Sequence, residues 1–218
     1  MRFSGVIFDL DGTLLDSLED IANAANATIA QLGGQVHPID AYKTMVGDGV
    51  GMLFERAFPE AMRDEAKKRE CFAVYEKAYD ANWNIRSKPY DGILEMIGKL
   101  QNANLKLAVL SNKPDSFTQK CVSHFFPSAN FDLVLGHSDR FPRKPDSTSA
   151  VWMGAELHID ASRMAYVGDT NTDMKTALGA RYSAIGVTWG FRPESELREC
   201  GAHEVVSTVD ELEKILLR

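Results

Sequence analysis

The chain has 218 residues, of which 44% are hydrophobic and 25% charged, the usual balance of a globular protein with a sizeable core. Its formal net charge of −7 argues against general nucleic-acid binding, and no apolar run approaches the roughly 20 residues that a membrane-spanning helix needs. The N-terminus has no signal-peptide pattern, and the three cysteines lie far apart and outside any metal spacing. We therefore expect a protein of the reducing cytoplasm, with no nucleic-acid or membrane partner.

Residues 6–16 contain the first motif whose side chains could take part in a reaction. An apolar run of strand length ends at Asp9, and Asp11, Gly12 and Thr13 follow. Alternate side chains of a strand share a face, so the two carboxylates would converge if the strand continued. Gly12 permits a sharp turn just beyond them. The pattern therefore places two acids at a strand end, which is where open α/β sheets bind ligands.

A second acid-rich motif, residues 167–173, also follows a short apolar run and contains Asp169 and Asp173. If three carboxylates met, their mutual repulsion would cost about 10 kcal/mol, which is comparable with the whole stability of a typical domain. A bound cation would cancel that repulsion. Ligands that are all oxygen atoms indicate a hard ion such as Mg²⁺.

The segment after the first motif is predicted to be an all-helical insert. Apolar residues recur at helical spacing in residues 17–32, shorter helices are expected over 39–45 and 52–58, and a charged helix over 63–79. No convincing strand falls between residues 16 and 87.

Beyond Pro89, strand-like and helix-like segments alternate. Strands are expected at residues 105–110, 131–135, 164–167 and 183–187, with a short edge strand at 205–206. The helices between them are expected to start at the caps Asp91 and Asp115 and to cover residues 146–157 and 171–178, and the capping-box pair Thr208 and Glu211 opens the last one. This alternation predicts a parallel sheet with helices on both faces.

Four motifs in order resemble those of the haloacid dehalogenase-like (HAD) hydrolase superfamily, and the whole chain most resembles its phosphoglycolate phosphatase-like group. They are Asp9-x-Asp11-Gly12-Thr13, Leu110-Ser111-Asn112-Lys113, Arg143-Lys144-Pro145-Asp146 and Gly168-Asp169-Thr170-Asn171-Thr172-Asp173. The resemblance implies an α/β, Rossmann-like three-layer core with a parallel sheet, formed by residues 1–15 and 88–218. It also implies an inserted helical cap domain, residues 16–87.

The resemblance further implies a Mg²⁺-dependent phosphatase with three catalytic residues. Asp9 would be the nucleophile, since an aspartate is already ionised at neutral pH and needs no base before it attacks phosphorus to form an aspartyl-phosphate. Asp11 would protonate the leaving alcohol and later deprotonate the attacking water. Lys144 would offset the charge of the phosphoryl group and of Asp9.

The remaining site residues would bind the phosphoryl group or the metal. Ser111 and Asn112 would hold the phosphoryl oxygens with a hydroxyl and backbone N–H groups. Mg²⁺ would be ligated by Asp9, Asp169 and the backbone carbonyl of Asp11, while Thr13 and Asp173 support the site. Asp173 would orient a metal-bound water or Lys144. For residues 189–192, after the last long strand, packing is the expected role.

The expected partner is a small phosphorylated metabolite, with 2-phosphoglycolate leading, and the protein is expected to be a monomer or a homodimer. A phosphosugar mutase and an inorganic pyrophosphatase of the same superfamily remain alternatives, although Thr13 favours phosphatases because mutases usually have Val there. Asp11 argues against a dehalogenase or a phosphonate hydrolase, which lack the acid–base aspartate. A non-catalytic binding module is disfavoured because the four central site residues, Asp9, Asp11, Lys144 and Asp169, are all present.

Overall fold

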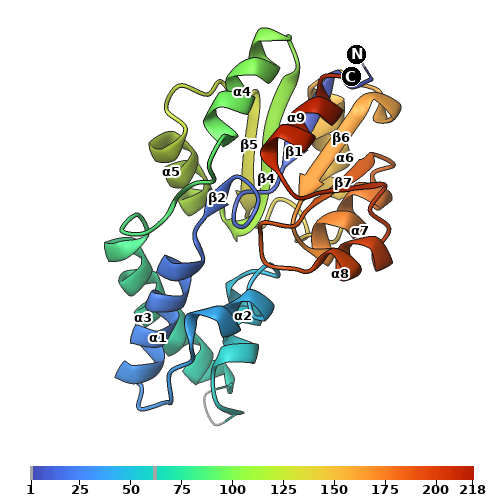
Figure 1. The fold of residues 1–218 in the computed structure, drawn as a ribbon. Coiled ribbons are helices and arrows are strands. Elements are labelled where there is room, and N and C mark those ends of the chain that lie inside the picture. The colour runs from blue at the N-terminus through green and yellow to red at the C-terminus, as the bar shows by residue number, and fades with distance from the viewer. Residues whose placement is uncertain (1, 61–62) are drawn as a thin grey trace. The chain divides into compact units, whose positions relative to one another are not determined.

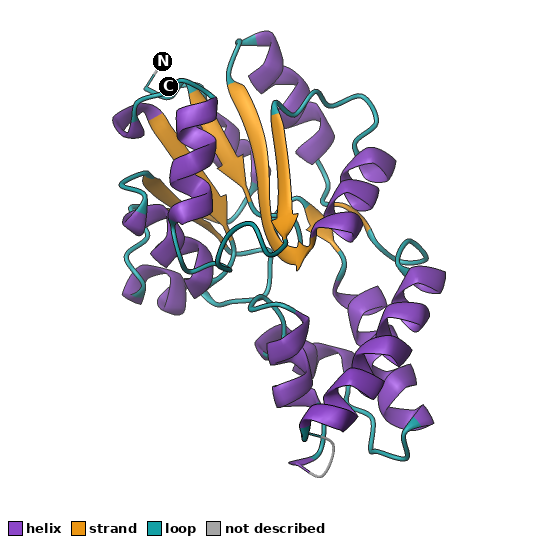
Figure 2. Ribbon diagram, turned by 180° about the vertical axis from the view of Figure 1, so that it is seen from behind, coloured by secondary structure: helices purple, strands orange, loops and turns teal. Residues whose placement is uncertain are grey.

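The computed structural model of the protein describes residues 2–60 and 63–218. The chain forms two compact units, one of residues 1–15 with 89–218 and the other of residues 16–88. The first unit contains a parallel sheet with helices around it, and the second is helical (Figures 1 and 2).

The sheet has six strands in the order β5-β4-β1-β6-β7-β8, and every neighbouring pair is parallel. Their bounds are β1 Gly5–Phe8, β4 Lys106–Pro114, β5 Leu133–His137, β6 Met164–Gly168, β7 Ser183–Val187 and β8 Glu204–Val206. The predicted α/β fold with a parallel sheet is confirmed. The central position of β1 places the end of the first motif in the middle of one sheet edge.

Helices cover both faces of this sheet. One face carries a buried cluster in which Ile7, Leu110 and Tyr166 of the strands pack against α6 (Thr148–Glu156), α7 (Asn171–Gly179) and α8 (Glu194–Glu199). On the other face, α4 (Ile93–Asn102) and α9 (Val209–Leu216) pack against each other and lie in front of the sheet in Figure 1. Helix α5 (Asp115–Phe125) packs on β4 and β5. The strands are apolar on both sides because both sides are covered.

The second unit consists of α1 (Leu18–Gln31), the 3₁₀ helix Ile39–Thr44, α2 (Val50–Ala57) and α3 (Glu65–Asn82), with α1 and α3 packed together. Its ends are joined by the buried carboxylate of Asp20 on α1. This carboxylate accepts hydrogen bonds from the backbone N–H groups of Arg86 and Ser87 and from the Ser87 hydroxyl, at 2.7–3.1 Å. The segment just before residue 88 is thereby fixed to the first helix of the same unit.

The structure differs from the sequence predictions mainly at element boundaries. Asp91 does not cap α4, because Gly92 occupies the cap position with a φ of +85°. Asp115 is the first residue of α5, and its carboxylate accepts a 2.7 Å hydrogen bond from the N–H of Gly136. Residues 39–44 form a 3₁₀ helix and not an α-helix. Among the described residues, four further elements were not predicted from the sequence: α8, the 3₁₀ turn Ala161–Arg163, and the paired two-residue strands β2 (Leu15–Asp16) and β3 (Lys88–Pro89).

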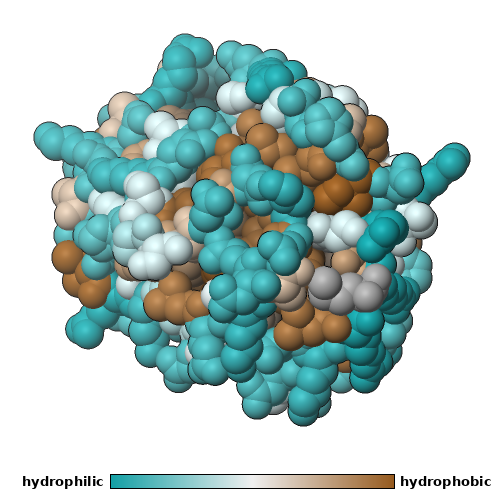
Figure 3. Space-filling view, turned by 90° about the horizontal axis from the view of Figure 1, so that it is seen from above, coloured by the Kyte–Doolittle hydropathy of each residue, from teal (hydrophilic) through white to brown (hydrophobic). Residues whose placement is uncertain are grey.

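Other predictions agree with the structure. Strand β7 has the expected bounds, and the capping box of Thr208 and Glu211 opens α9. Among the residues described, no helix combines the length and the apolar character that a membrane crossing demands. Figure 3 shows hydrophilic side chains over most of the face it draws, with hydrophobic ones between them.

Candidate active site

The carboxyl ends of three adjacent strands bring three of the four motifs to one edge of the sheet, and the fourth, with Lys144, lies in the loop between β5 and α6. Asp9 follows β1, Ser111 to Lys113 form the end of β4, and Asp169 follows β6. Strands β4 and β6 both pair in parallel with β1, with Phe8 opposite Val109 and Val167. Because parallel strands end at the same edge, segments that are distant in the sequence meet there.

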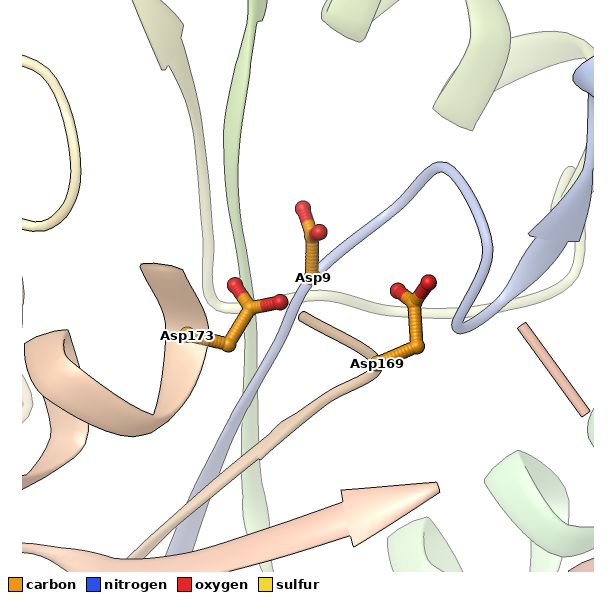
Figure 4. A group of neighbouring side chains, drawn as sticks. All are labelled: Asp9, Asp169 and Asp173. Carbon is orange, nitrogen blue, oxygen red and sulfur yellow. The ribbon is translucent and has the colours of Figure 1, made fainter. Parts of the chain in front are cut away.

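Three buried carboxylates form the centre of the site. Asp9, Asp169 and Asp173 each offer an oxygen atom, and these atoms all lie within 4.8 Å of one another. Figure 4 shows the carboxylate of Asp173 directed toward Asp9, with Asp169 beside them. The sequence-based expectation that acids of the first and last motifs would meet is thus matched by the geometry.

Asp9 has one fixed and one open carboxylate oxygen. Its Oδ1 accepts hydrogen bonds from the N–H of Leu10 at 2.7 Å and from Nζ of Lys144 at 2.9 Å. Within the described ranges, Oδ2 receives no hydrogen bond from the protein. Burial, followed by the charge of Asp173, raises the pKa of Asp9 to about 7, although Lys144 opposes the shift. Without further positive charge, this carboxyl holds its proton far more tightly than an exposed aspartate does.

Lys144 connects two of the acids. Its side chain is 2% exposed, and Nζ lies 2.7 Å from Oδ1 of Asp173 and 2.9 Å from Oδ1 of Asp9. Nζ also donates to the carbonyl of Leu110 at 3.0 Å. Burial alone would lower the pKa of Lys144, but the carboxylates of Asp173 and Asp9 outweigh burial and hold the pKa well above its ordinary value. The lysine is therefore a permanent positive charge at this site.

Among the described residues, the donors that hold the Asp169 carboxylate are all neutral. Its Oδ1 accepts a 2.8 Å hydrogen bond from the Thr13 hydroxyl, and its Oδ2 accepts one of 2.8 Å from the N–H of Phe191. Burial first, then the charges of Asp173 and Asp9, raise the pKa of Asp169 well above its usual value. The Asp169 side chain lies so close to Gly12 that a Cβ at that position would collide with its carboxylate, and Gly12 has a φ of +86°. Only glycine satisfies both requirements.

The Asp173 carboxylate takes part in the cap of helix α7 and also pairs with Lys144. Its Oδ2 accepts hydrogen bonds from the N–H of Thr170 at 3.0 Å and from the Thr170 hydroxyl at 2.6 Å, which completes a capping box at the start of α7. Its Oδ1 accepts from Lys144. The expected role of Asp173, orienting Lys144, is compatible with these contacts.

The loop of residues 189–191 does more than the packing expected of it. Nε1 of Trp189 donates a 3.1 Å hydrogen bond to the carbonyl of Thr13, and Phe191 donates to Asp169. A Cβ on Gly190 would collide with the Asp169 side chain and the Gly12 carbonyl. The loop therefore holds Asp169 and the Thr13 turn in place. The sequence feature that could have indicated this role is a glycine between two aromatic residues.

Ser111 and Asn112 lie buried where the pairing of β4 with β5 becomes irregular, between Leu110 and Pro114. Irregularities of this kind re-aim side chains beside active sites. The Asn112 amide exchanges two hydrogen bonds with the backbone of Lys144, at 2.9 and 3.1 Å. The Ser111 hydroxyl accepts from the N–H of Lys113 at 3.2 Å. The Asn112 side chain thus positions the Lys144 loop, while phosphoryl binding by these two residues stays a prediction.

Asp11 is paired with Lys113, a motif residue for which the sequence predicted no role. Nζ of Lys113 donates to both carboxylate oxygens of Asp11, at 3.0 and 2.9 Å. The Lys113 side chain is 6% exposed and that of Asp11 16%. In the sequence, Lys113 directly follows Ser111-Asn112 at a strand end. That position alone does not distinguish a buried lysine from a surface one.

The charges of the cluster match a divalent cation. Asp9, Asp169 and Asp173, if ionised, bring three negative charges, and among the described residues only Lys144 makes ion pairs with them. Burial first, and then the neighbouring carboxylates, raise the pKa values of Asp9 and Asp169, and a bound cation would oppose both effects. The donors are all oxygen atoms, which suits a hard ion such as Mg²⁺. The residues present therefore fit this metal.

Comparisons with known proteins agree with this geometry. The family model of haloacid dehalogenase-like hydrolases matches residues 6–187. A phosphoglycolate phosphatase of Photobacterium profundum is 31% identical over 87% of this chain and 86% of its own length. One of Neisseria meningitidis is 34% identical over 85% of this chain and 80% of its own length. A solved structure from Lactobacillus delbrueckii, described as a proposed phosphoglycolate phosphatase, has a TM-score of 0.90 and 28% identity and covers 99% of both chains.

The family match spans the edge of the sheet at which all four motifs meet, from the first acids to the strand β7. The relatives align along most of their own length, so the likeness extends beyond the motifs to both compact units. The resemblance inferred from the sequence is confirmed. The chain belongs to the haloacid dehalogenase-like hydrolase family.

Proposed function

We propose that 2-phosphoglycolate is the substrate, and Mg²⁺ the cofactor, of this HAD-family phosphatase. The relatives named phosphoglycolate phosphatase support the substrate, and the cluster of three buried carboxylates supports the metal. The observation that carries the chemistry is the state of Asp9. Its Oδ1 is fixed by Leu10 and Lys144, while Oδ2 has no hydrogen-bond donor within the described ranges. A held carboxylate with one open oxygen is what a nucleophile requires.

The first half of the reaction transfers the phosphoryl group to Asp9. A carboxylate oxygen of Asp9 forms a bond to phosphorus while the bond from phosphorus to the alcohol oxygen breaks. Asp11 gives its proton to that oxygen, and the alcohol leaves neutral. In the second half, Asp11 takes a proton from the water that attacks phosphorus. Phosphate leaves, and both aspartates return to their starting states. Lys144 balances the negative charge at Asp9 throughout.

Asp9, Asp169 and the backbone carbonyl of Asp11 would hold the Mg²⁺ ion, with Thr13 and Asp173 as supporting residues. When bound, the ion supplies positive charge to the phosphoryl oxygens and to the acidic cluster. Ser111 and Asn112 would bind the phosphoryl oxygens at the end of β4. Their position at the same sheet edge supports this role.

We assign the helical unit as the cap of the enzyme, a lid that excludes bulk water during turnover. The predicted bounds of this cap were residues 16–87, and the compact helical unit consists of residues 16–88. The mutase alternative is not favoured, because the curated relatives carry phosphatase names. A cytoplasmic location and an assembly as a monomer or a homodimer stay predictions.

The substrate is tested by phosphate release with Mg²⁺, with 2-phosphoglycolate, pyrophosphate, nucleotides and hexose phosphates compared by kcat/KM. We expect 2-phosphoglycolate to be preferred. Preference for pyrophosphate or a hexose phosphate would overturn the substrate assignment. An isomerised sugar phosphate that accumulates without free phosphate would indicate the mutase.

The nucleophile is tested by Asp9→Asn, which removes the attacking carboxylate and should lower kcat at least about 1,000-fold. Asp210→Asn is the matched control, since Asp210 is exposed in the first turn of α9; its turnover should equal that of the unaltered enzyme. Near-normal turnover by Asp9→Asn would remove Asp9 from its role. Activity that persists in excess EDTA would likewise contradict the metal dependence.

A further inference from the structure

Lys113 is the second buried lysine of the site, and it serves a different acid from Lys144. Its Nζ donates to both carboxylate oxygens of Asp11, at 2.9 and 3.0 Å. Lys144 instead bridges Asp9 and Asp173. The structure therefore gives the nucleophile and the acid–base residue one lysine each.

The fold brings Lys113 to Asp11 from a neighbouring strand. Strands β1 and β4 run side by side, with Phe8 opposite Val109, and Asp11 and Lys113 both lie beyond these partners toward the same sheet edge. The pairing of β4 with β5 is irregular between Leu110 and Pro114, the stretch that includes Lys113. The lysine side chain is 6% exposed. Burying a lysine is costly unless it is paired, so its placement is specific.

The pair with Lys113 engages both oxygens of the Asp11 carboxylate. Asp11 lies just outside β1, in the turn where the Leu10 carbonyl accepts hydrogen bonds from residues 13–15. A short side chain in a turn can rotate freely unless a partner holds it. Contact with both oxygens sets the plane of the carboxylate as well as its position. Each oxygen keeps a second lone pair on which a proton can sit, so this contact is compatible with proton transfer.

We propose that Lys113 is a positioning residue for proton transfer, which holds the Asp11 carboxylate where it exchanges a proton with the leaving alcohol. This inference rests on the proposed function of Asp11. Its chemical consequence concerns the leaving group. An oxygen that departs as a basic anion needs the proton from Asp11, whereas one that departs as a stable anion hardly does.

The test compares phenyl phosphate with 4-nitrophenyl phosphate. The two esters are similar in shape and lack a carboxylate, but nitrophenolate is the more stable leaving anion. The constant kcat/KM reports events up to departure of the phenol, so later hydrolysis of the aspartyl-phosphate does not affect it. For Lys113→Met we expect kcat/KM to fall about 100-fold with phenyl phosphate and less than about 5-fold with 4-nitrophenyl phosphate. Asp11→Asn should shift the same ratio in the same direction.

Equal losses with both esters would overturn the inference, because they would indicate a general effect on the site. A rise in KM with 2-phosphoglycolate, at an unchanged ratio for the two aryl esters, would also overturn it, because Lys113 would then bind the substrate. A merely structural role for Lys113 would not change the ratio.

A double variant covers the case in which Lys113→Met alone does not fold. Asp11→Asn with Lys113→Met leaves no unpaired carboxylate at this position. If Lys113 acts through Asp11, adding Lys113→Met to Asp11→Asn should change kcat/KM by less than about 3-fold, since the two residues act as a unit. A further loss of about 10-fold or more would show an independent role and contradict the inference.

The two hypotheses can fail separately. If Asp9→Asn remains active, the proposed function fails, and the inference about Lys113 is overturned with it. If catalysis depends on Asp9 but the ratio of the two aryl esters stays constant in Lys113→Met, only the inference about Lys113 is wrong.

Discussion

The backbone N–H of Phe191 donates a hydrogen bond of 2.8 Å to Oδ2 of Asp169. Because the donor is a backbone group, the position of Asp169 depends on the backbone conformation at Phe191. It does not depend on the aromatic side chain. That conformation requires Gly190, where a Cβ would collide with the Asp169 side chain and with the carbonyl of Gly12. The loop after β7 thus positions Asp169, an acid that follows a different strand, β6.

Gly190→Ala should therefore displace Asp169. We expect the Mg²⁺ concentration that gives half-maximal phosphate release to rise at least about 10-fold, as is common when a group that orients a metal ligand is disturbed. A Mg²⁺ titration of phosphate release measures this. Gly98→Ala is the control, because a Cβ on Gly98 meets nothing within 4 Å and the residue lies in α4. The control should keep the Mg²⁺ dependence; an unchanged dependence in Gly190→Ala would show that the loop does not hold Asp169.

Much of this site could be predicted from the sequence, because its residues lie in short motifs at strand ends. The apolar runs before Asp9 and Asp169 locate two strands, and parallel strands bring their carboxyl ends together. The Phe191 hydrogen bond could not be predicted, since every residue has a backbone N–H and no sequence pattern indicates which one is used. Lys113 could not be predicted either, because its burial depends on the irregular end of β4.

Lys144→Met should destabilise the Mg²⁺-free protein at neutral pH by about 3–5 kcal/mol, because it leaves the buried carboxylates of Asp9 and Asp173 without their cation. Urea denaturation measures the change, and added Mg²⁺ should recover part of the loss. Lys99→Met is a matched control: Lys99 also contacts two carboxylates, Glu95 and Glu213, but its side chain is 46% exposed. The free energy of unfolding of the control should change little. Equal effects of the two substitutions would contradict the role of burial.

Asp169→Asn and Asp173→Asn should differ in their effects on metal binding. Asp173 is already paired with Lys144, whereas the donors to Asp169 in the described ranges are all neutral. The charge of Asp169 is therefore the better match for a cation. We expect Asp169→Asn to weaken Mg²⁺ binding at least about 10-fold more than Asp173→Asn does. Isothermal titration with MgCl₂ tests this. The reverse order would make Asp173 the direct ligand.

The stability of the Mg²⁺-free protein should depend on pH through Asp9. The folded-state pKa of Asp9 is about 7, against an ordinary value of 3.8. The folded state therefore binds this proton more tightly than the unfolded state does. The contribution of protonated Asp9 to the free energy of unfolding is fully present below pH 3.8 and is lost as the pH rises toward about 7. Between these limits, the unaltered protein should lose on the order of 4 kcal/mol relative to Asp9→Asn.

Chemical denaturation of both proteins in EDTA across this pH range measures the difference. With saturating Mg²⁺ the fall should be reduced, because the metal binds the ionised carboxylate. A difference between the two proteins that is constant with pH would show that Asp9 keeps its ordinary pKa in the folded state.

At two predicted helix starts, the aspartate expected to cap the helix does not do so. Asp91 is a good cap residue by type, but Gly92 adopts the positive φ with which the chain enters α4. Likewise, Asp115 uses its carboxylate for Gly136 of the adjacent strand β5. For Asp115, the local pattern cannot show that a tertiary partner competes for the carboxylate. In the described part of the chain, the side chains of Thr208 and Glu211 bond only within residues 207–211, and the predicted cap is present.

The contacts of the Asp20 carboxylate bear on whether the helical segment could be exchanged between related genes. Because Asp20 binds the backbone of Arg86 and Ser87, the start and the end of the helical segment are secured by contacts within the segment itself. A segment closed in this way adds little loop-closure entropy to the chain that carries it. An exchange of this segment by recombination at residues 16 and 88 would therefore replace the whole helical unit, while Asp9, Asp169 and Asp173 would keep their places in the other unit.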